Sequence, residues 1–313
     1  MKKKILICGA TGFIGRNLVE YYSTLPGFEV TAVYHKVPPY EIPNVVWRQA
    51  DLRNPEEVDV LMVSQDIVLQ FAATTSGAKD IVSTPEVHVT DNAVMNSYIF
   101  RSAKDHNVGH VVFPSCTVMY QPAGDVREED FNNKILERYF GVGHTKVYLE
   151  KMCEFFASIS DTKFTVIRHS NIYGPHDKYD LDKSHVFGAT ITKVMTAVDK
   201  VVVWGTGEEK RDFLHIEDLV NFVDAAIENQ VAKFELFNVG CGEGVSIKEL
   251  VELVIANSGK NLTIEYDLSQ PHIPTSIWLN CDKACDKLDW YPQYPLSDGI
   301  IDTIQWWREN VAD

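Results

Sequence analysis

The chain lacks any long apolar run: nowhere in its 313 residues do the roughly 18 consecutive apolar residues of a membrane span occur. It is also poor in basic residues, with 29 Lys and Arg against 44 Asp and Glu, a formal net charge of −15. Such a field repels polyanions, and no basic patch interrupts it. The sequence therefore predicts neither a membrane partner nor a nucleic acid partner.

The cysteines of the chain also lack the regular spacing of a metal site. Its six cysteines are scattered, and no two Cys or His pairs have zinc-ligand spacing, so we expect no metal site. Free thiols fit a reducing compartment. The apolar run behind the basic residues 1–4 is short, and Gly9 and Gly12 interrupt it, unlike a secretory leader. We expect a cytoplasmic protein.

The first half of the chain alternates short apolar runs with helical patterns. This alternation predicts a parallel sheet with right-handed crossovers. The expected strands are 4–8, 29–34, 45–47, 66–71, 110–114 and 163–168, and the clearest helices are 13–22, 90–106 and 143–159.

Beyond about residue 175 the pattern loosens, and residues 176–184 read as a loop. The expected elements are helices at 186–198, 216–229, 246–257 and 297–309, with a strand at 201–204. No internal repeat and no low-complexity linker divides the chain.

A glycine-rich segment joins the first strand to the first helix: Gly9-Ala10-Thr11-Gly12-Phe13-Ile14-Gly15. Glycines at this spacing let the backbone turn tightly, approach a pyrophosphate and present helix N-terminal amides to it. The strand-turn-helix context distinguishes this fingerprint from a merely structural turn. We therefore expect a Rossmann-type, doubly wound α/β domain. Its cofactor contacts are expected at Gly9, Thr11, Gly12, Phe13, Ile14 and Gly15.

The end of the second strand carries no acidic residue. An acidic side chain there would bind the adenosine ribose of NAD, but the chain has Tyr34, His35 and Lys36, with Arg16 just past the glycine turn. Cationic groups suit a 2′-phosphate, so we expect NADP rather than NAD; the alternative is that His35 and Lys36 lie in a solvated loop. Further cofactor contacts are expected at Asp51 and Leu52 for the adenine, and at Phe71, Ala72 and Ala73 for the ribose and nicotinamide side.

Later segments carry a family resemblance. They are Arg-His-Ser-Asn-Ile-Tyr-Gly-Pro at 168–175, the stretches 203–207 and 211–219, and Asn-Val-Gly at 238–240 followed by Ser246. With the glycine pattern, they resemble the extended short-chain dehydrogenase/reductase family, the nucleotide-sugar epimerases and dehydratases. Residues 115–117, 173–177 and 183–186 are most similar to the GDP-L-fucose synthases of that family, which are NADPH-dependent 3,5-epimerases and 4-reductases.

The resemblance implies a GDP-linked 4-keto-6-deoxy sugar or a close relative as substrate. It also implies a homodimer formed by a four-helix bundle from the helices at 90–106 and 143–159. The expected division is a cofactor-binding domain at 1–175 plus about 213–242, and a smaller C-terminal α/β lobe at 176–212 and 243–313 that binds the nucleotide sugar. A 4-keto group acidifies the neighbouring carbons, so epimerisation needs a base and an acid, and reduction needs a hydride and a proton.

The same resemblance places the catalytic residues. Ser115 matches the hydroxyl that polarises the carbonyl, and His185 matches the acid/base histidine. Thr117 stands where fucose synthases carry a catalytic Cys, with Cys116 one position away. Lys146 aligns with the Lys of the family's Tyr-x-x-x-Lys signature and should hold the cofactor. Substrate contacts are expected at Asn171, His185, Val186, Trp204 and Arg211.

One part of the signature is missing, because Val142 stands where the family has the Tyr four residues before Lys146. Valine has no proton to give. Three functions are therefore open: an NADP-dependent epimerase/reductase, an isomerase that reduces weakly or not at all, and a cofactor-binding or regulatory protein with impaired catalysis.

Overall fold

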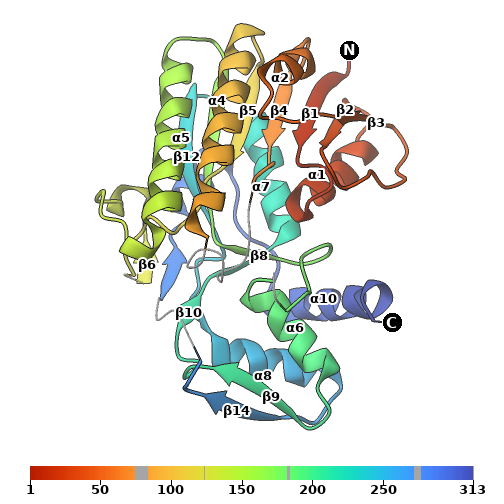
Figure 1. The fold of residues 1–313 in the computed structure, drawn as a ribbon, viewed down its shortest axis with the longest axis vertical. Coiled ribbons are helices and arrows are strands. Elements are labelled where there is room, and N and C mark those ends of the chain that lie inside the picture. Colours follow the sequence, from red (N-terminus) through yellow and green to blue (C-terminus); the bar gives the residue numbers. More distant parts are fainter. Residues whose placement is uncertain (75–83, 123, 182–183, 271–275, 313) are drawn as a thin grey trace.

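The computed structural model of the chain describes residues 1–74, 84–122, 124–181, 184–270 and 276–312 (Figure 1). Its largest sheet has seven strands in the order β12-β7-β5-β4-β1-β2-β3, and every neighbouring pair is parallel. The strands are β1 Lys3–Cys8, β2 Phe28–Tyr34, β3 Val45–Gln49, β4 Ile67–Gln70, β5 His110–Pro114, β7 Lys163–His169 and β12 Phe234–Val239. The Rossmann-type parallel sheet is confirmed.

The chain winds outward from β1 in two directions, first to β2 and β3 and then to β4 and beyond. In sheets of this kind the crevice at the reversal point, outside the carboxyl ends of the strands, takes the ligand. The end of β1 and the turn after it are therefore where a cofactor is expected.

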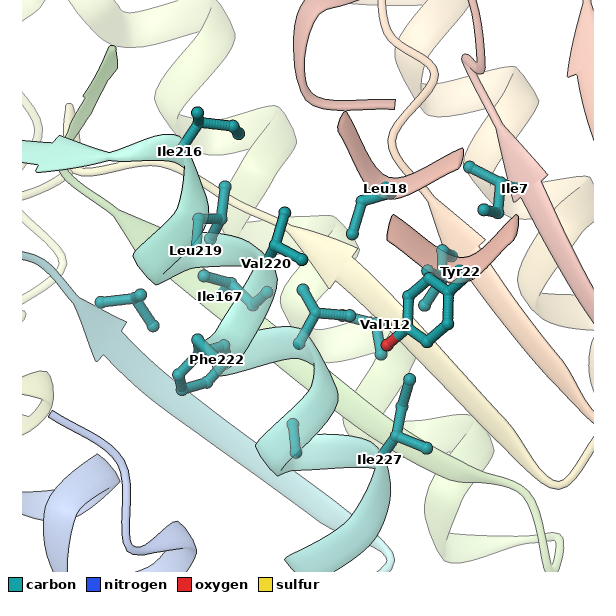
Figure 2. Close-up of a cluster of buried hydrophobic side chains, with 14 of the residues drawn as sticks. Ile7, Leu18, Tyr22, Val112, Ile167, Ile216, Leu219, Val220, Phe222 and Ile227 are labelled. Carbon is teal, nitrogen blue, oxygen red and sulfur yellow. The ribbon is translucent and has the colours of Figure 1, made fainter. Parts of the chain in front are cut away.

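Helices cover both faces of the sheet. One face is packed by α1 (Phe13–Thr24), α7 (Ile216–Asn229) and α9 (Asp282–Leu288), and the other by α2 (Pro55–Met62), α4 (Thr90–Asp105) and α5 (Phe140–Ser158). Figure 2 shows the first face, where side chains of α1 and α7 such as Tyr22 and Phe222 lie over the sheet. Apolar residues line both faces, which is why the strands read as continuous apolar runs.

A smaller lobe lies below the carboxyl ends of the strands in Figure 1. It contains α6 (Val186–Thr196), α8 (Ile247–Ser258), α10 (Leu296–Asn310) and the parallel pair β9 (Lys200–Trp204) and β14 (Thr263–Asp267). Its own apolar core includes Phe187, Leu250 and Trp307. Because this core is separate from the two sheet faces, the lobe can form one wall of a cleft.

Short elements join the two parts. They are the sheet β13-β10-β15-β6 (Val245–Ser246, Lys210–Arg211, Ile277–Leu279 and Gly124–Val126) and the pair β8 (Asn171–Tyr173) and β11 (Phe213–His215). The remaining elements are the 3-10 helices η1 (Pro85–His88), η2 (Glu128–Asp130) and η3 (Glu137–Tyr139). No helix of the described residues combines the length and the apolar character that a membrane crossing requires.

Candidate functional site

In the glycine turn, the backbone packs closely against itself and against the backbone at Ala72. Gly9 has φ 76°, and a Cβ added to it would lie 2.7 Å from the Ala72 nitrogen. A Cβ on Gly15 would lie 2.1 Å from the Gly9 carbonyl oxygen. Gly12 begins α1 without a side-chain cap, so the first amides of the helix stay available for an anion. A side chain would fill this cradle, so the residues present fit the diphosphate of a dinucleotide.

A pocket of about 270 Å³ lies beside this turn, lined by Thr11, Gly12, Arg16, His176, Trp306 and Asn310. Arg16 is held there, since its Nε donates to Glu20 Oε1 at 2.9 Å and its guanidinium lies 4.2 Å from the Tyr40 ring centre. His176 Nε2 is 3.1 Å from Glu20 Oε2. Glu20 therefore balances the charge of Arg16, which the sequence did not reveal.

The adenosine end of the crevice holds a charged cluster at the tips of β2 and β3. Asp51 Oδ2 is 2.7 Å from Arg53 Nη2 and 3.8 Å from His35 Nε2. The hydrogen bonds from Arg53 hold the pKa of Asp51 well below its usual range. Asp51 is thus a carboxylate held in place by the neighbouring guanidinium of Arg53. Arg53 was not predicted from the sequence. Lys36 follows in the exposed loop, and Leu52 is buried.

The hydroxyl of Ser115 faces the core rather than the crevice. Ser115 is 2 % exposed, and its Oγ donates to Glu150 Oε1 at 2.5 Å. Glu150 also accepts from both Nε and Nη2 of Arg168, at 3.0 and 2.7 Å. Strand geometry points the side chains of Ser115 and Arg168 toward α5. The ion pair of Arg168 with Glu150 is buried there, and a buried ion pair needs all its hydrogen bonds. The structure thus ties the Ser115 hydroxyl to Glu150, and its contact with a substrate carbonyl stays a prediction.

Lys146 and Cys116 lie together at the end of β5. Lys146 Nζ donates to the Pro114 carbonyl at 2.8 Å and lies 4.8 Å from the Phe113 ring centre. Burial lowers the pKa of the Lys146 amine, and the nearby Cys116 opposes this shift. Burial raises the pKa of the Cys116 thiol, so the thiol is neutral at pH 7. Val142 lies one turn earlier on α5, half-buried.

His169, the last residue of β7, completes this cluster. Its Nδ1 is 2.8 Å from the Ser170 carbonyl oxygen. Burial, together with the nearby charges of Lys146 and His185, lowers the pKa of His169 to about 4. His185 is the N-cap of α6, so it approaches from the smaller lobe. Lys146 and His185 therefore lie near a histidine that we had not singled out, and Cys116 lies near Lys146.

Thr117 follows Cys116 in the turn after β5, where its carbonyl accepts from the Tyr120 amide at 3.0 Å. Phe71, Ala72 and Ala73 follow β4, the neighbour of β5 in the sheet, and Ala72 touches the glycine turn. The ends of β1, β4, β5 and β7 thus form one continuous floor.

The other expected substrate residues lie farther apart. Asn171 Nδ2 donates to the Asp212 carbonyl at 3.0 Å and so ties β8 to the residue before β11. Arg211 lies in β10, half-buried, and Val186 begins α6. Trp204 ends β9, 49 % exposed, with Lys193 Nζ 5.0 Å from its ring centre. Lys183, part of the resemblance, lies outside the described residues.

Known proteins resemble this chain over its whole length. A dTDP-4-dehydro-6-deoxy-D-allose reductase of Streptomyces bikiniensis is 28% identical over 99% of this chain and 97% of its own. A GDP-L-fucose synthase of Azorhizobium caulinodans is 28% identical over 97% of this chain and 96% of its own.

Among solved structures, a UDP-glucuronic acid 4-epimerase of Bacillus cereus, in complex with UDP-glucuronic acid and NAD, superposes with a TM-score of 0.84 at 24% identity. The alignment covers 98% of this chain and 99% of that one, and it shows a shared fold. Residues 5–240 match the NAD dependent epimerase/dehydratase family. The chain therefore belongs to this family of nicotinamide-dependent enzymes, the extended short-chain dehydrogenases/reductases that act on nucleotide sugars.

Proposed function

We propose that the chain is an NADP-dependent epimerase/reductase that acts on a 4-keto nucleotide sugar, with a GDP-linked deoxy sugar as the favoured substrate. The observation that carries this proposal is the cluster of Cys116, Lys146, His169 and His185 at the ends of β5 and β7. It lies on the same edge of the sheet as the glycine turn. A carbonyl sugar placed there would meet both a cofactor and groups that move protons.

The bound nicotinamide would supply the hydride for reduction at the carbonyl carbon. Lys146 would hold the cofactor ribose, and the glycine turn would hold the diphosphate. His185 would take and return a proton at a carbon next to the carbonyl, with Cys116 or Thr117 near the opposite face of the ring. Arg211 would bind the nucleotide diphosphate, since a guanidinium forks well onto phosphate oxygens. Asn171, Val186 and Trp204 remain proposed contacts of the substrate lobe.

A second candidate function is an isomerase that reduces weakly. Val142 favours it, because the position one turn before Lys146 carries no exchangeable proton. Such an enzyme would keep proton exchange through His185 while its reduction step stays slow.

We also propose a homodimer. The outer face of α5 carries Phe140, Tyr148 and Phe155, followed by the C-cap residue Ile159, and these are 65 %, 58 %, 56 % and 52 % exposed. Exposed apolar side chains repeating along one helix support an interface with a second helix. The proposed four-helix bundle would pair α4 and α5 with their copies in the partner subunit. The free state of all six cysteines supports a cytoplasmic location.

Proton exchange tests the proposed epimerisation. Incubating the protein with NADPH and GDP- or dTDP-linked 4-keto-6-deoxyhexoses in D₂O should place deuterium at C3 and C5 of the sugar. Replacing His185 with alanine should slow this exchange at least about tenfold, because the carbon loses its base. The matched control is His106→Ala, since His106 pairs with Asp59 after the end of α4 and lies away from the cluster. Equal exchange in wild type and His185→Ala would remove His185 from the reaction.

Cofactor preference tests the assignment of NADP. The protein should bind NADPH at least about tenfold more tightly than NADH, since one added charge-assisted hydrogen bond is worth roughly 1.5–3 kcal/mol. Lys36→Glu should abolish or reverse the preference, and Lys2→Glu, at the exposed N-terminus, should leave it intact. Calorimetric titration with both cofactors measures this, and tighter binding of NADH by the wild type would contradict the assignment.

A further inference from the structure

Reduction of a carbonyl needs a proton for its oxygen, and the groups first expected to supply it are absent or engaged. Val142 has no proton, and the hydroxyl of Ser115 is bonded to Glu150 inside the protein. Tyr148 lies on the exposed outer face of α5. His144 is exposed on the same helix, with its ring 4.7 Å from the Phe140 ring. Apart from Cys116 and Thr117 in the turn after β5, the donor must therefore come from another element.

His169 has the right place in the fold. β7 is hydrogen-bonded to β5, with Pro114 opposite Ile167, and the Ser115 amide donates to the Ile167 carbonyl at 2.7 Å. His169 therefore ends β7 beside the turn that carries Cys116 and Thr117. The floor of the crevice runs from the glycine turn through the ends of β4 and β5 to this residue. His169 therefore lies on the same edge of the sheet as the glycine turn that would hold the cofactor.

The imidazole of His169 is fixed in orientation and in tautomer. The Ser170 carbonyl oxygen only accepts, so Nδ1 of His169 must carry a hydrogen and donate it. Nε2 makes no hydrogen bond within the described part of the chain, and the side chain is half-buried. Lys146 approaches from α5 and His185 from the N-cap of α6. Nε2 is therefore the ring nitrogen left to meet a substrate.

We propose that His169 is a catalytic acid/base of this enzyme, which exchanges a proton between its Nε2 and the carbonyl oxygen of the sugar. This inference rests on the proposed function, because it assigns the proton step of that reduction. His169, at the end of strand β7, would thus replace the proton-donating hydroxyl that is missing at Val142 on α5.

In the direction of reduction, two bonds form at the carbonyl group. The carbonyl carbon would gain the hydride that a bound nicotinamide supplies from its C4–H bond, while the C=O π pair would take the proton of His169 Nε2 to form an O–H bond. The sugar is reduced, the nicotinamide is oxidised, and His169 becomes neutral. Solvent then returns the proton to Nε2. In the reverse direction, neutral Nε2 accepts the hydroxyl proton as the hydride leaves.

This assignment fixes the sign of the pH dependence. Burial and the positive charge of Lys146 hold the pKa of His169 near 4, so its protonated fraction falls as pH rises above that value. Reduction needs the protonated form, so its rate should rise about tenfold for each unit that pH falls between about 8 and 5. Oxidation of the alcohol needs the neutral form and should be nearly independent of pH over that range.

The test compares wild type with His169→Gln, and with His106→Gln as a matched histidine away from the site. The reaction is NADPH oxidation by GDP- and dTDP-linked 4-keto-6-deoxyhexoses, followed as a function of pH. We expect His169→Gln to lose at least about 100-fold in rate near pH 6 and to lose the pH slope. Its affinity for NADPH should stay within about twofold of wild type, which shows that the variant is folded. Added imidazole should restore part of the activity of His169→Gly.

A second readout needs no turnover. In ¹H–¹⁵N spectra of the protein without substrate, the ring signals missing from His169→Gln should show the Nδ1–H tautomer and titrate near pH 4. An unchanged rate and pH slope in His169→Gln would overturn the role of His169 while leaving the proposed function standing. If wild type binds NADPH but oxidises it with no 4-keto sugar at any pH, the proposed function fails and this inference with it.

Discussion

Replacing Gly15 with valine is expected to weaken NADPH binding by more than about 100-fold, or roughly 3 kcal/mol. The first added carbon would lie 2.1 Å from the carbonyl oxygen of Gly9 and 2.7 Å from its carbonyl carbon. Both contacts are with backbone, so no side chain can move aside. The turn itself must shift, and with it the amides that face the diphosphate. Calorimetric titration with NADPH measures the loss.

Gly27→Val is the matched control for this substitution. A Cβ on Gly27 meets nothing within 4 Å, and the residue precedes β2 at the amino end of the sheet. This variant should bind NADPH as the wild type does. Circular dichroism of both variants separates a distorted turn from an unfolded chain. Undiminished binding by a folded Gly15→Val protein would show that the cofactor does not use this turn.

Glu150→Ala is expected to lower the free energy of unfolding by about 3–5 kcal/mol. Glu150 and Arg168 are 5 % and 4 % exposed, and their closest charged atoms are 2.7 Å apart. The substitution leaves a guanidinium in the core with no carboxylate, and it removes the acceptor of the Ser115 hydroxyl. Tyr120, which accepts from Arg168 at 2.9 Å, cannot neutralise the charge. Urea denaturation measures the difference.

Glu154→Ala provides the comparison one turn along the same helix. Glu154 pairs with Lys151 at 2.7 Å, but both side chains are largely exposed. Exposed pairs of this kind contribute about 0.5 kcal/mol or less. Equal losses for the two variants would mean that helix propensity, rather than the buried ion pair, determines the effect of Glu150→Ala.

Much of the fold could be predicted from the sequence because local patterns specify it. The apolar runs at 4–8 and 110–114 coincide with β1 and β5 to within a residue, since strands buried on both faces tolerate few polar side chains. The glycine turn was equally plain, because its spacing serves a steric need that each glycine meets locally. The helix expected at 143–159 begins three residues earlier, at Phe140, directly after η3.

The candidate site was only partly predictable, because its side chains meet through long-range packing. Ser115 matched a motif, yet the partner that determines its direction, Glu150, lies 35 residues away on another element. His169 was visible as the residue after a predicted strand, where parallel sheets place functional groups. Its proximity to Lys146 and His185 depends on how α5 and α6 dock, which no local pattern reveals.

The most direct test of the central claim is transfer of deuterium from NADPH labelled at C4 of the nicotinamide to a 4-keto nucleotide sugar. Incubation of the wild-type protein with the labelled cofactor and GDP- or dTDP-linked 4-keto-6-deoxyhexoses, followed by mass spectrometry of the sugar, detects even slow reduction. We expect one deuterium at C4 of the reduced sugar. Tight binding of the labelled cofactor with no deuterium in any sugar would contradict it and would identify the chain as a protein that binds the cofactor without reducing these sugars.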